Sequence, residues 1–236
     1  MLAGILPARA LAAEPAASPS PAAPAAAASP APSGADAPEF GHAGQVTFSV
    51  WRLYGLSLDS RQVALPPDGK TYQRMDSTTL SLFGTDAPKP YGVPRLGADY
   101  FITDHFSIGA AGMFLYRDQQ NVGPANLLVV TPRVSGGFAL SKLFSIWVLG
   151  GVTWSRDATT QVDFQNGPTA LTSTHVESGV AATLDAMLIV TPKGPFGFLV
   201  GPAADIGFAG NLETTKSARS IGLLGGLVAW LSPPYF

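Results

Sequence analysis

The chain has 236 residues, 14 basic against 16 acidic and no cysteine, which gives a formal net charge of −2. Charged residues make up only 13% and hydrophobic residues 46%, whereas soluble globular domains carry about 25% charged residues. This composition excludes disorder of the whole chain and disulfides, and it argues against nucleic-acid binding because no basic excess could neutralise phosphates. A helical membrane protein is also disfavoured, because no run of about 18 apolar residues occurs.

The first forty residues differ from the rest. Residues 12–38 are mostly Ala, Pro and Ser, a composition that is typical of a disordered, partly extended linker. Ala10-Leu11-Ala12 has the small-x-small form of a signal-peptidase site. We therefore expect a truncated signal-like segment over residues 1–12, a disordered linker over 13–43 and a folded domain over 44–236.

The folded domain shows the period of two residues that is typical of β-strands. Apolar side chains alternate with small or polar ones in segments of about 12 to 19 residues, which exceeds the five or six of an ordinary strand. This pattern predicts eight main strands, at about 45–58, 92–103, 105–118, 126–140, 143–157, 172–190, 195–210 and 218–231.

Charges in the middle of these strands lie on the face with the small residues, opposite the bulky apolar face. A barrel whose outside touches lipid has this arrangement. We therefore expect a structural charge network in the barrel interior, in which the two arginines each have a carboxylate partner; its members are Arg95, Asp99, Arg133, Glu177, Asp185 and Asp205. Arg52 breaks the alternation, so it lies near an interface or a β-bulge shifts the register.

The links between the strands alternate in length. Short links lie at 103–105, 141–142 and 191–194, and long polar links at 59–91, 118–125, 157–172 and 210–218. Residues 77–84 also have a strand pattern, and we interpret them as an extension or hairpin within the first long link. Short links on one side and long ones on the other predict an antiparallel up-and-down barrel of the outer membrane, with the long loops outside.

Two segments resemble a known family. Residues 93–109, Val-Pro-Arg-Leu-Gly-Ala-Asp-Tyr-Phe-Ile-Thr-Asp-His-Phe-Ser-Ile-Gly, resemble the strand–turn–strand unit of small, eight-stranded bacterial outer-membrane β-barrel domains, as do residues 189–202 around Thr191-Pro192. The resemblance implies an all-β transmembrane barrel that contacts membrane lipid and is assembled by the barrel-assembly machinery, for which the terminal Phe236 is a common signal. Pro233 and Pro234 place the end of the last strand near Leu231, because proline cannot donate to a β-ladder.

The chemistry-bearing residues leave the function open. Ser173, His175 and Glu177 lie on one face of one strand, and such residues could form the catalytic set of a membrane lipid hydrolase similar to lipid A deacylases. Neighbours on one strand face lie about 7 Å apart, too far for direct hydrogen bonds unless the side chains bend together, so we favour a polar lining of the barrel mouth as the explanation. We expect a structural or surface-interaction protein without catalytic chemistry, cofactor or metal, whose extracellular partner is unknown.

Aromatic side chains lie mostly toward the strand ends. We interpret them as girdles at the two membrane interfaces, since transmembrane barrels carry such belts. The set is Trp51, Tyr54, Tyr100, Phe101, Phe106, Tyr116, Phe138, Phe144, Trp154, Phe196, Phe208 and Trp230.

Overall fold

The computed structural model describes residues 39–64, 72–82, 91–119, 123–163, 171–192, 194–211 and 215–232. Among these residues the regular structure is entirely β, and no helix is long and apolar enough to cross a membrane. The strands are β1 (Val46–Ala64), β2 (Tyr72–Leu82), β3 (Arg95–Thr103), β4 (Phe106–Gln119), β5 (Gly123–Ala139), β6 (Phe144–Asp163), β7 (Leu171–Val190), β8 (Phe196–Asn211) and β9 (Thr215–Leu231).

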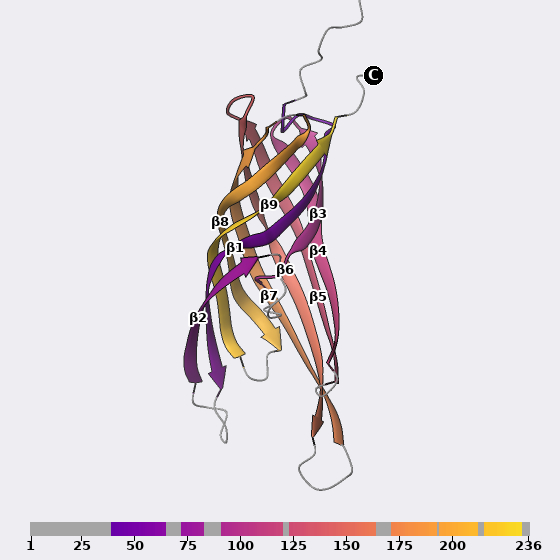
Figure 1. Cartoon of the computed structure of the whole chain (residues 1–236), viewed down its shortest axis with the longest axis vertical. Helices are drawn as coiled ribbons and strands as arrows, with labels where there is room; N and C mark the ends of the chain where they lie inside the picture. Colours follow the sequence, from indigo (N-terminus) through magenta and orange to yellow (C-terminus); the bar gives the residue numbers. More distant parts are fainter. Residues whose placement is uncertain are drawn as a thin grey trace, which may run out of the picture. The chain divides into compact units, whose positions relative to one another are not determined.

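These strands form one antiparallel sheet that closes into a barrel (Figure 1). From β3 to β9 each strand pairs with the next one in sequence, and β1 pairs with β9 to close the ring. The short turns gather at the end of the barrel where β1 begins and β9 finishes. An antiparallel up-and-down barrel, which the alternation of links predicts, is therefore confirmed.

β2 and β3 share one edge of β1. The half of β1 that is farther from the short turns, from Tyr54 to Ala64, pairs with β2; we call the end of the barrel at which it lies the outer end. The half nearer the short turns, from Val46 to Trp51, pairs with β3. β2 and β3 run in the same direction, so together they occupy one strand position in the wall. Among the described residues the barrel thus has eight strand positions and nine strand segments. The described part of the predicted strand at 77–84, residues 77–82, belongs to β2 and pairs with β1, while residues 83 and 84 lie outside the described residues.

A β-bulge in β1 marks the point where its partner changes. Opposite β9, four steps from Val50 to Tyr54 correspond to only two from Leu227 to Gly225, and Arg52 has a φ of 62°. The bulge adds two residues, an even number, so the odd-numbered side chains of β1 face the interior on both sides of it. Of the two explanations that the sequence offered for Arg52, the bulge is correct.

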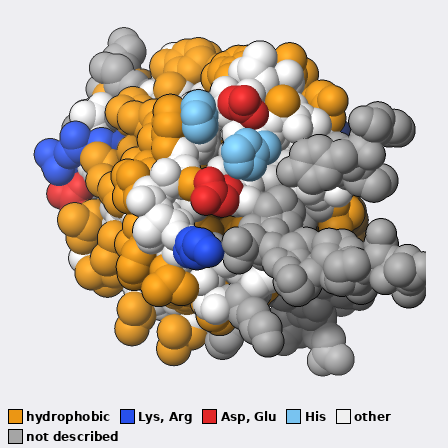
Figure 2. Space-filling view, turned by 90° about the horizontal axis from the view of Figure 1, so that it is seen from above, with side chains coloured by type: hydrophobic (Ala, Val, Ile, Leu, Met, Phe, Trp, Pro, Cys, Tyr) orange, Lys and Arg blue, Asp and Glu red, His pale blue; other side chains and the backbone are white. Residues whose placement is uncertain are grey.

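The two faces of the wall carry opposite chemistry. Outward side chains of β6 such as Phe144, Val152 and Trp154 are 42%, 46% and 38% exposed, while the alternate residues Trp147 and Thr153 are buried inside. Figure 2 looks at the short-turn end and shows hydrophobic side chains over the flank, with histidine and acidic side chains on the end face. This inverted pattern is the one that the sequence predicts.

The structure corrects three of the predicted boundaries, which are the start of the folded domain and the ends of β1 and β6. Residues 39–43, which were assigned to the disordered linker, pack against the barrel, because Phe40 inserts its ring into the interior and is 3% exposed. β1 and β6 run on to Ala64 and Asp163, well into the predicted long links, since each continues in a hairpin with its neighbour. The remainder of the predicted linker lies outside the described residues.

The interpretation of the aromatic residues as interfacial girdles is wrong for three of them. Trp51, Phe101 and Trp230 are 2%, 0% and 2% exposed and lie inside the barrel. Their positions share the inward face of their strands with buried polar residues such as Thr47 and Asp99. Position near a strand end therefore misled the interpretation, and alternation along the strand is the better guide.

Candidate functional site

An aromatic cluster closes the interior at the short-turn end. Phe40 meets Phe101, Trp147 and Trp230 edge to face, with ring centroids 5.4 to 5.5 Å apart. Edge-to-face rings at this spacing attract one another beyond the effect of area burial. The segment before β1, residues 39–45, thereby plugs the short-turn end of the barrel, and we call it the stopper.

Hydrogen bonds from the short turn between β3 and β4 hold this stopper in place. The Gly44 amide donates to the Phe101 carbonyl at 2.8 Å, and the His105 amide donates to the Gly41 carbonyl at 2.7 Å. The Ala43 amide donates to the Asp104 carboxylate at 2.9 Å. This last bond is the main reason that the pKa of Asp104 is lowered, since it favours the ionised form.

A second layer joins the aromatic cluster to buried charges. The Arg133 Nε donates to the Asp99 carboxylate at 2.9 Å, and its Nη2 donates to the Ser49 hydroxyl at 3.1 Å. The Arg133 guanidinium also lies 4.8 Å from the centre of the Trp51 ring and 5.4 Å from that of Trp147. Cation–π contacts of this kind gain strength when water is excluded.

The third layer is a four-residue charge cluster in the middle of the barrel. Arg52 pairs with Asp205 and with Asp185, the latter at 3.2 Å, and Arg95 pairs with Asp205 at 3.2 Å. All four side chains are at most 2% exposed. Threonines extend the network, because Arg95 donates to Thr131 and Thr153, and Thr183 donates to Asp205.

A short segment before β3 folds into the interior above this cluster. The Tyr91 carbonyl accepts hydrogen bonds from both Arg52 and Arg95, and the Tyr91 side chain packs against Ala181 and Ala218. Gly179 and Gly207 make room for it, since a Cβ at either position would come within 3.1 to 3.2 Å of the Tyr91 hydroxyl. Small residues on β7, β8 and β9 thus form a socket for one tyrosine.

The structure places five of the six predicted interior charges in these layers. They are Arg95, Asp99, Arg133, Asp185 and Asp205, each at most 5% exposed. Arg95 and Arg133 each have a carboxylate partner, Asp205 and Asp99 respectively. Glu177 lies apart from the rest, on the inward face of β7 nearer the outer end, where it is half-buried.

The structure brings together two of the three residues of the hypothetical hydrolase. His175 Nε2 lies 3.3 Å from a Glu177 carboxylate oxygen, both side chains being partly exposed. The Ser173 side chain lies outside the described part, although its backbone pairs with Gln161 of β6. In the part of the chain that the structure describes, no group of three or more His, Asp and Glu side chains could hold a metal ion.

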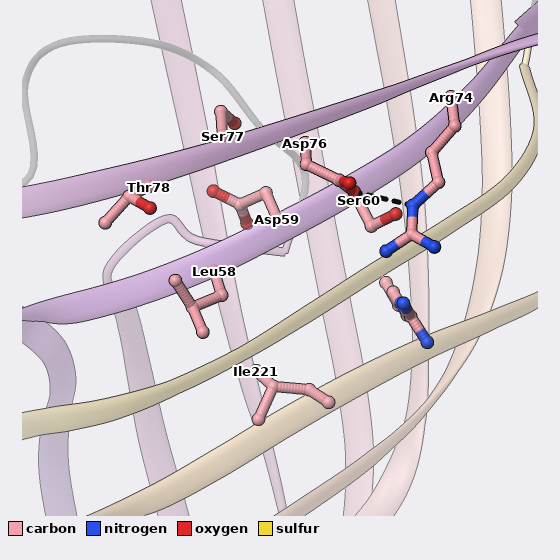
Figure 3. Close-up of a pocket in the computed structure, with 9 residues that line it drawn as sticks. Leu58, Asp59, Ser60, Arg74, Asp76, Ser77, Thr78 and Ile221 are labelled. Carbon is pink, nitrogen blue, oxygen red and sulfur yellow. Dashed lines mark hydrogen bonds and ion pairs between the residues drawn. The ribbon is translucent and has the colours of Figure 1, made fainter.

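A pocket on the outer face of the wall was not anticipated from the sequence. It has a volume of about 470 Å³ and lies where β1 runs between β2 and β9 (Figure 3). Arg74 and Arg219 reach it from the two flanking strands, and Arg74 Nε donates to Asp76 at 2.9 Å. Leu58 and Ile221 line its apolar side, and Ser60 of β1 lies beside the carboxylate of Asp76 and the guanidinium of Arg74 (Figure 3).

These residues were missed for identifiable reasons. Tyr91 and Arg74 fall in a segment that the sequence predicts as a long loop, where no alternation assigns a side chain to a face. Phe40 follows a low-complexity segment that masks its role. Arg219 belongs to a predicted strand, so its outward parity with the apolar Ile221 was the one available signal.

No family model matches the chain, and no curated protein does. Among solved structures, similarity is found to Ail, the attachment invasion locus protein of Yersinia pestis (10% identity, TM-score 0.39, covering 80% of this chain and 99% of that one). It is also found to Neisserial surface protein A (12%, 0.42, 79% and 97%) and to the N-terminal β-barrel domain of Pseudomonas aeruginosa OprF (11%, 0.35, 80% and 98%). These similarities concern the fold and carry no information on activity.

Proposed function

We propose that the protein is an integral outer-membrane barrel with a structural or surface-interaction role, and that its outer end is the working surface. The observation that carries the proposal is the inverted wall: apolar side chains face outward around the ring, and charged side chains are buried inside. Contact with water would disfavour an apolar outer face, whereas contact with lipid favours it. A closed barrel also suits lipid because it pairs its backbone groups internally.

The outer end is the more extended end of the barrel. β6 and β7 pair with each other as far as Asp163 and Leu171, while β5 pairs with β6 only to Thr159. The β1–β2 hairpin extends at the same end. Exposed extensions on a rigid scaffold are where recognition tends to occur, which supports an interaction role at this surface.

Epitope tags on intact cells test this proposal. Tags at Asp68-Gly69 and Asn166-Gly167, which lie outside the described residues, should be labelled from outside, whereas tags at Ser141-Lys142 should be reached only after the envelope is opened. The folded protein should also migrate differently from the boiled protein on a gel. Release of the protein from washed envelopes without detergent, or the opposite labelling pattern, would contradict the proposal.

The contact between His175 and Glu177 favours a second candidate, a membrane lipid hydrolase in which Ser173 is the nucleophile. In this role His175 would take the serine proton and Glu177 would orient the imidazole. Lipid A isolated from cells with the wild-type protein, with Ser173→Ala and with His175→Ala should then differ in acylation. Identical lipid profiles in cells with and without the wild-type protein would eliminate this candidate.

A further inference from the structure

We propose that the pocket on the outer face of β1, β2 and β9 binds a phosphorylated glycolipid of the outer leaflet, with the phosphate between Arg74 and Arg219. This inference rests on the proposed function, because it requires the barrel to stand in the outer membrane. Three features of the pocket carry it: the side of the wall that it faces, its level relative to the apolar belt, and its charge.

The pocket faces outward. Ser60 pairs with Asp76 on β2 and with Arg219 on β9, and cross-strand partners project from the same face of a sheet. Ile206, the partner of Arg219 on β8, is 55% exposed on the outer wall. The adjoining pocket of about 220 Å³ shares Ser60, Arg74 and Arg219, so the concave surface continues across β9 toward β8.

The pocket lies at the edge of the apolar belt that is nearer the outer end of the barrel. Toward the short-turn end, the next outward-facing residues after Ser60 are Leu58 and its partner Ile221, which are 60% and 48% exposed. The outward-facing residues after these are Leu56, Leu80 and Leu223, which are 47% to 72% exposed. An arginine that faces lipid costs about 2–4 kcal/mol at the bilayer midplane and about 0–1 kcal/mol near the interface. The two arginines therefore fit the headgroup level, directly above a surface suited to acyl chains.

The charge of the pocket suits an anion. Its outward charged groups are Arg74, Arg219 and Asp76, which together carry one positive charge. Asp76 accepts a hydrogen bond from the Nε of Arg74 and so orients the guanidinium, which Figure 3 shows beside Ser60. Asp59 also lines the pocket, but it is buried at 6% exposure on the inward parity of β1, where its carboxylate accepts hydrogen bonds from Ser57 and Thr79. Guanidinium groups bind phosphate oxygens with paired hydrogen bonds.

The chain offers a matched control for the two arginines. Arg156 on β6 is also exposed on the outward face above an apolar wall residue, Trp154. Its cross-strand partners are Leu128 and Ser178, so it has no second arginine opposite it on the neighbouring strands. An unspecific attraction between surface arginines and anionic lipid would involve Arg156 as much as Arg74 and Arg219.

Native mass spectrometry of the full chain in detergent, with bisphosphorylated lipid A as the probe, tests the inference. We expect Arg74→Gln/Arg219→Gln to weaken lipid A binding at least tenfold, since each lost charge-assisted hydrogen bond is worth about a factor of ten. Arg156→Gln should bind like the wild type. Dephosphorylated lipid A should bind as weakly as the double variant, and millimolar inorganic phosphate should not displace lipid A.

Several outcomes would overturn the inference: unchanged binding by the double variant, equal loss in Arg156→Gln, or displacement by inorganic phosphate, which would indicate a bare anion site. Heat-modifiable migration shows whether each variant is folded, and the single Arg219→Gln replaces the double variant if that one does not fold. Failure of the wild-type protein to insert into any bilayer would refute the proposed function itself. Insertion without selectivity for phosphorylated lipid A would refute this inference alone.

Discussion

Single buried charges decide whether the interior holds together. The pair of Arg133 and Asp99 is sealed from solvent, so loss of one partner leaves the other charged and unpaired, whereas loss of both removes the problem. A barrel interior built in this way is sensitive to single substitutions and tolerant of matched ones.

We therefore expect Asp99→Asn to lower the free energy of unfolding by about 3 kcal/mol, measured by urea titration of the refolded protein in detergent micelles. The double variant Asp99→Leu/Arg133→Met should recover most of this loss, because two apolar side chains need no partner. A double variant that is as unstable as the single one would show that the pair stabilises the barrel by more than the mutual neutralisation of its two charges.

The Tyr91 socket can be tested with one added methyl group. Gly179→Ala should destabilise the barrel by about 1 kcal/mol through overpacking, because the new Cβ would meet the Tyr91 hydroxyl at 3.2 Å. Tyr91→Phe removes that hydroxyl, so Tyr91→Phe/Gly179→Ala should lose less than the sum of the two single variants. Strict additivity in the same urea titration would place the tyrosine outside the socket.

At the scale of elements, the alternation of each strand could be predicted from the sequence, whereas the cause of its interruptions could not. A period of two follows from strand geometry and from the contrast between lipid and interior, so the outward faces of β6, β7 and β8 could be predicted residue by residue. The sequence shows Arg52 as a break in the alternation but does not decide between a bulge and an interfacial position, because the bulge depends on β1 changing partner from β3 to β2. The inward turn at Tyr91 depends on the buried side chains of Arg52 and Arg95, which donate hydrogen bonds to its carbonyl.

The segment before β1 is an element without regular structure but with a packing role. Phe40→Ala should lower the free energy of unfolding by about 3 kcal/mol, since it leaves a cavity among three aromatic rings. Phe48→Ala is the control, because Phe48 faces outward and is 51% exposed. Equal losses in both variants would mean that Phe40 does not act as the stopper.

The attachment of this segment should depend on pH. The pKa of Asp104 is lowered by the Ala43 amide, so the contact is at full strength above the ordinary aspartate pKa and is lost as pH falls through the lowered value. Limited proteolysis with pepsin around residues 39–45, between pH 2 and 5, should show faster cleavage at the acid end. In Asp104→Asn the rate of cleavage relative to a cut elsewhere in the chain should not vary with pH.

At the scale of the whole molecule, the three interior layers predict a barrel that does not conduct. Eight strand positions enclose a lumen that side chains just fill, and here rings, ion pairs and the Tyr91 segment cross it in succession. The purified protein in planar bilayers should show no stable single-channel current. A steady current in the wild type would contradict this filling, and a current only in Phe40→Ala would locate the seal at the aromatic stopper.

The pairing of β1 with β9 has a consequence for the order of events during synthesis. The first strand of the ring pairs with the last one, so one hydrogen-bonding edge of β1 stays unpaired until β9 has been made. Unpaired strand edges invite wrong partners, and contacts so distant in sequence form slowly. The growing chain therefore depends on being sheltered until β9 arrives, and a lesion in β1 becomes apparent only at the final step of closure.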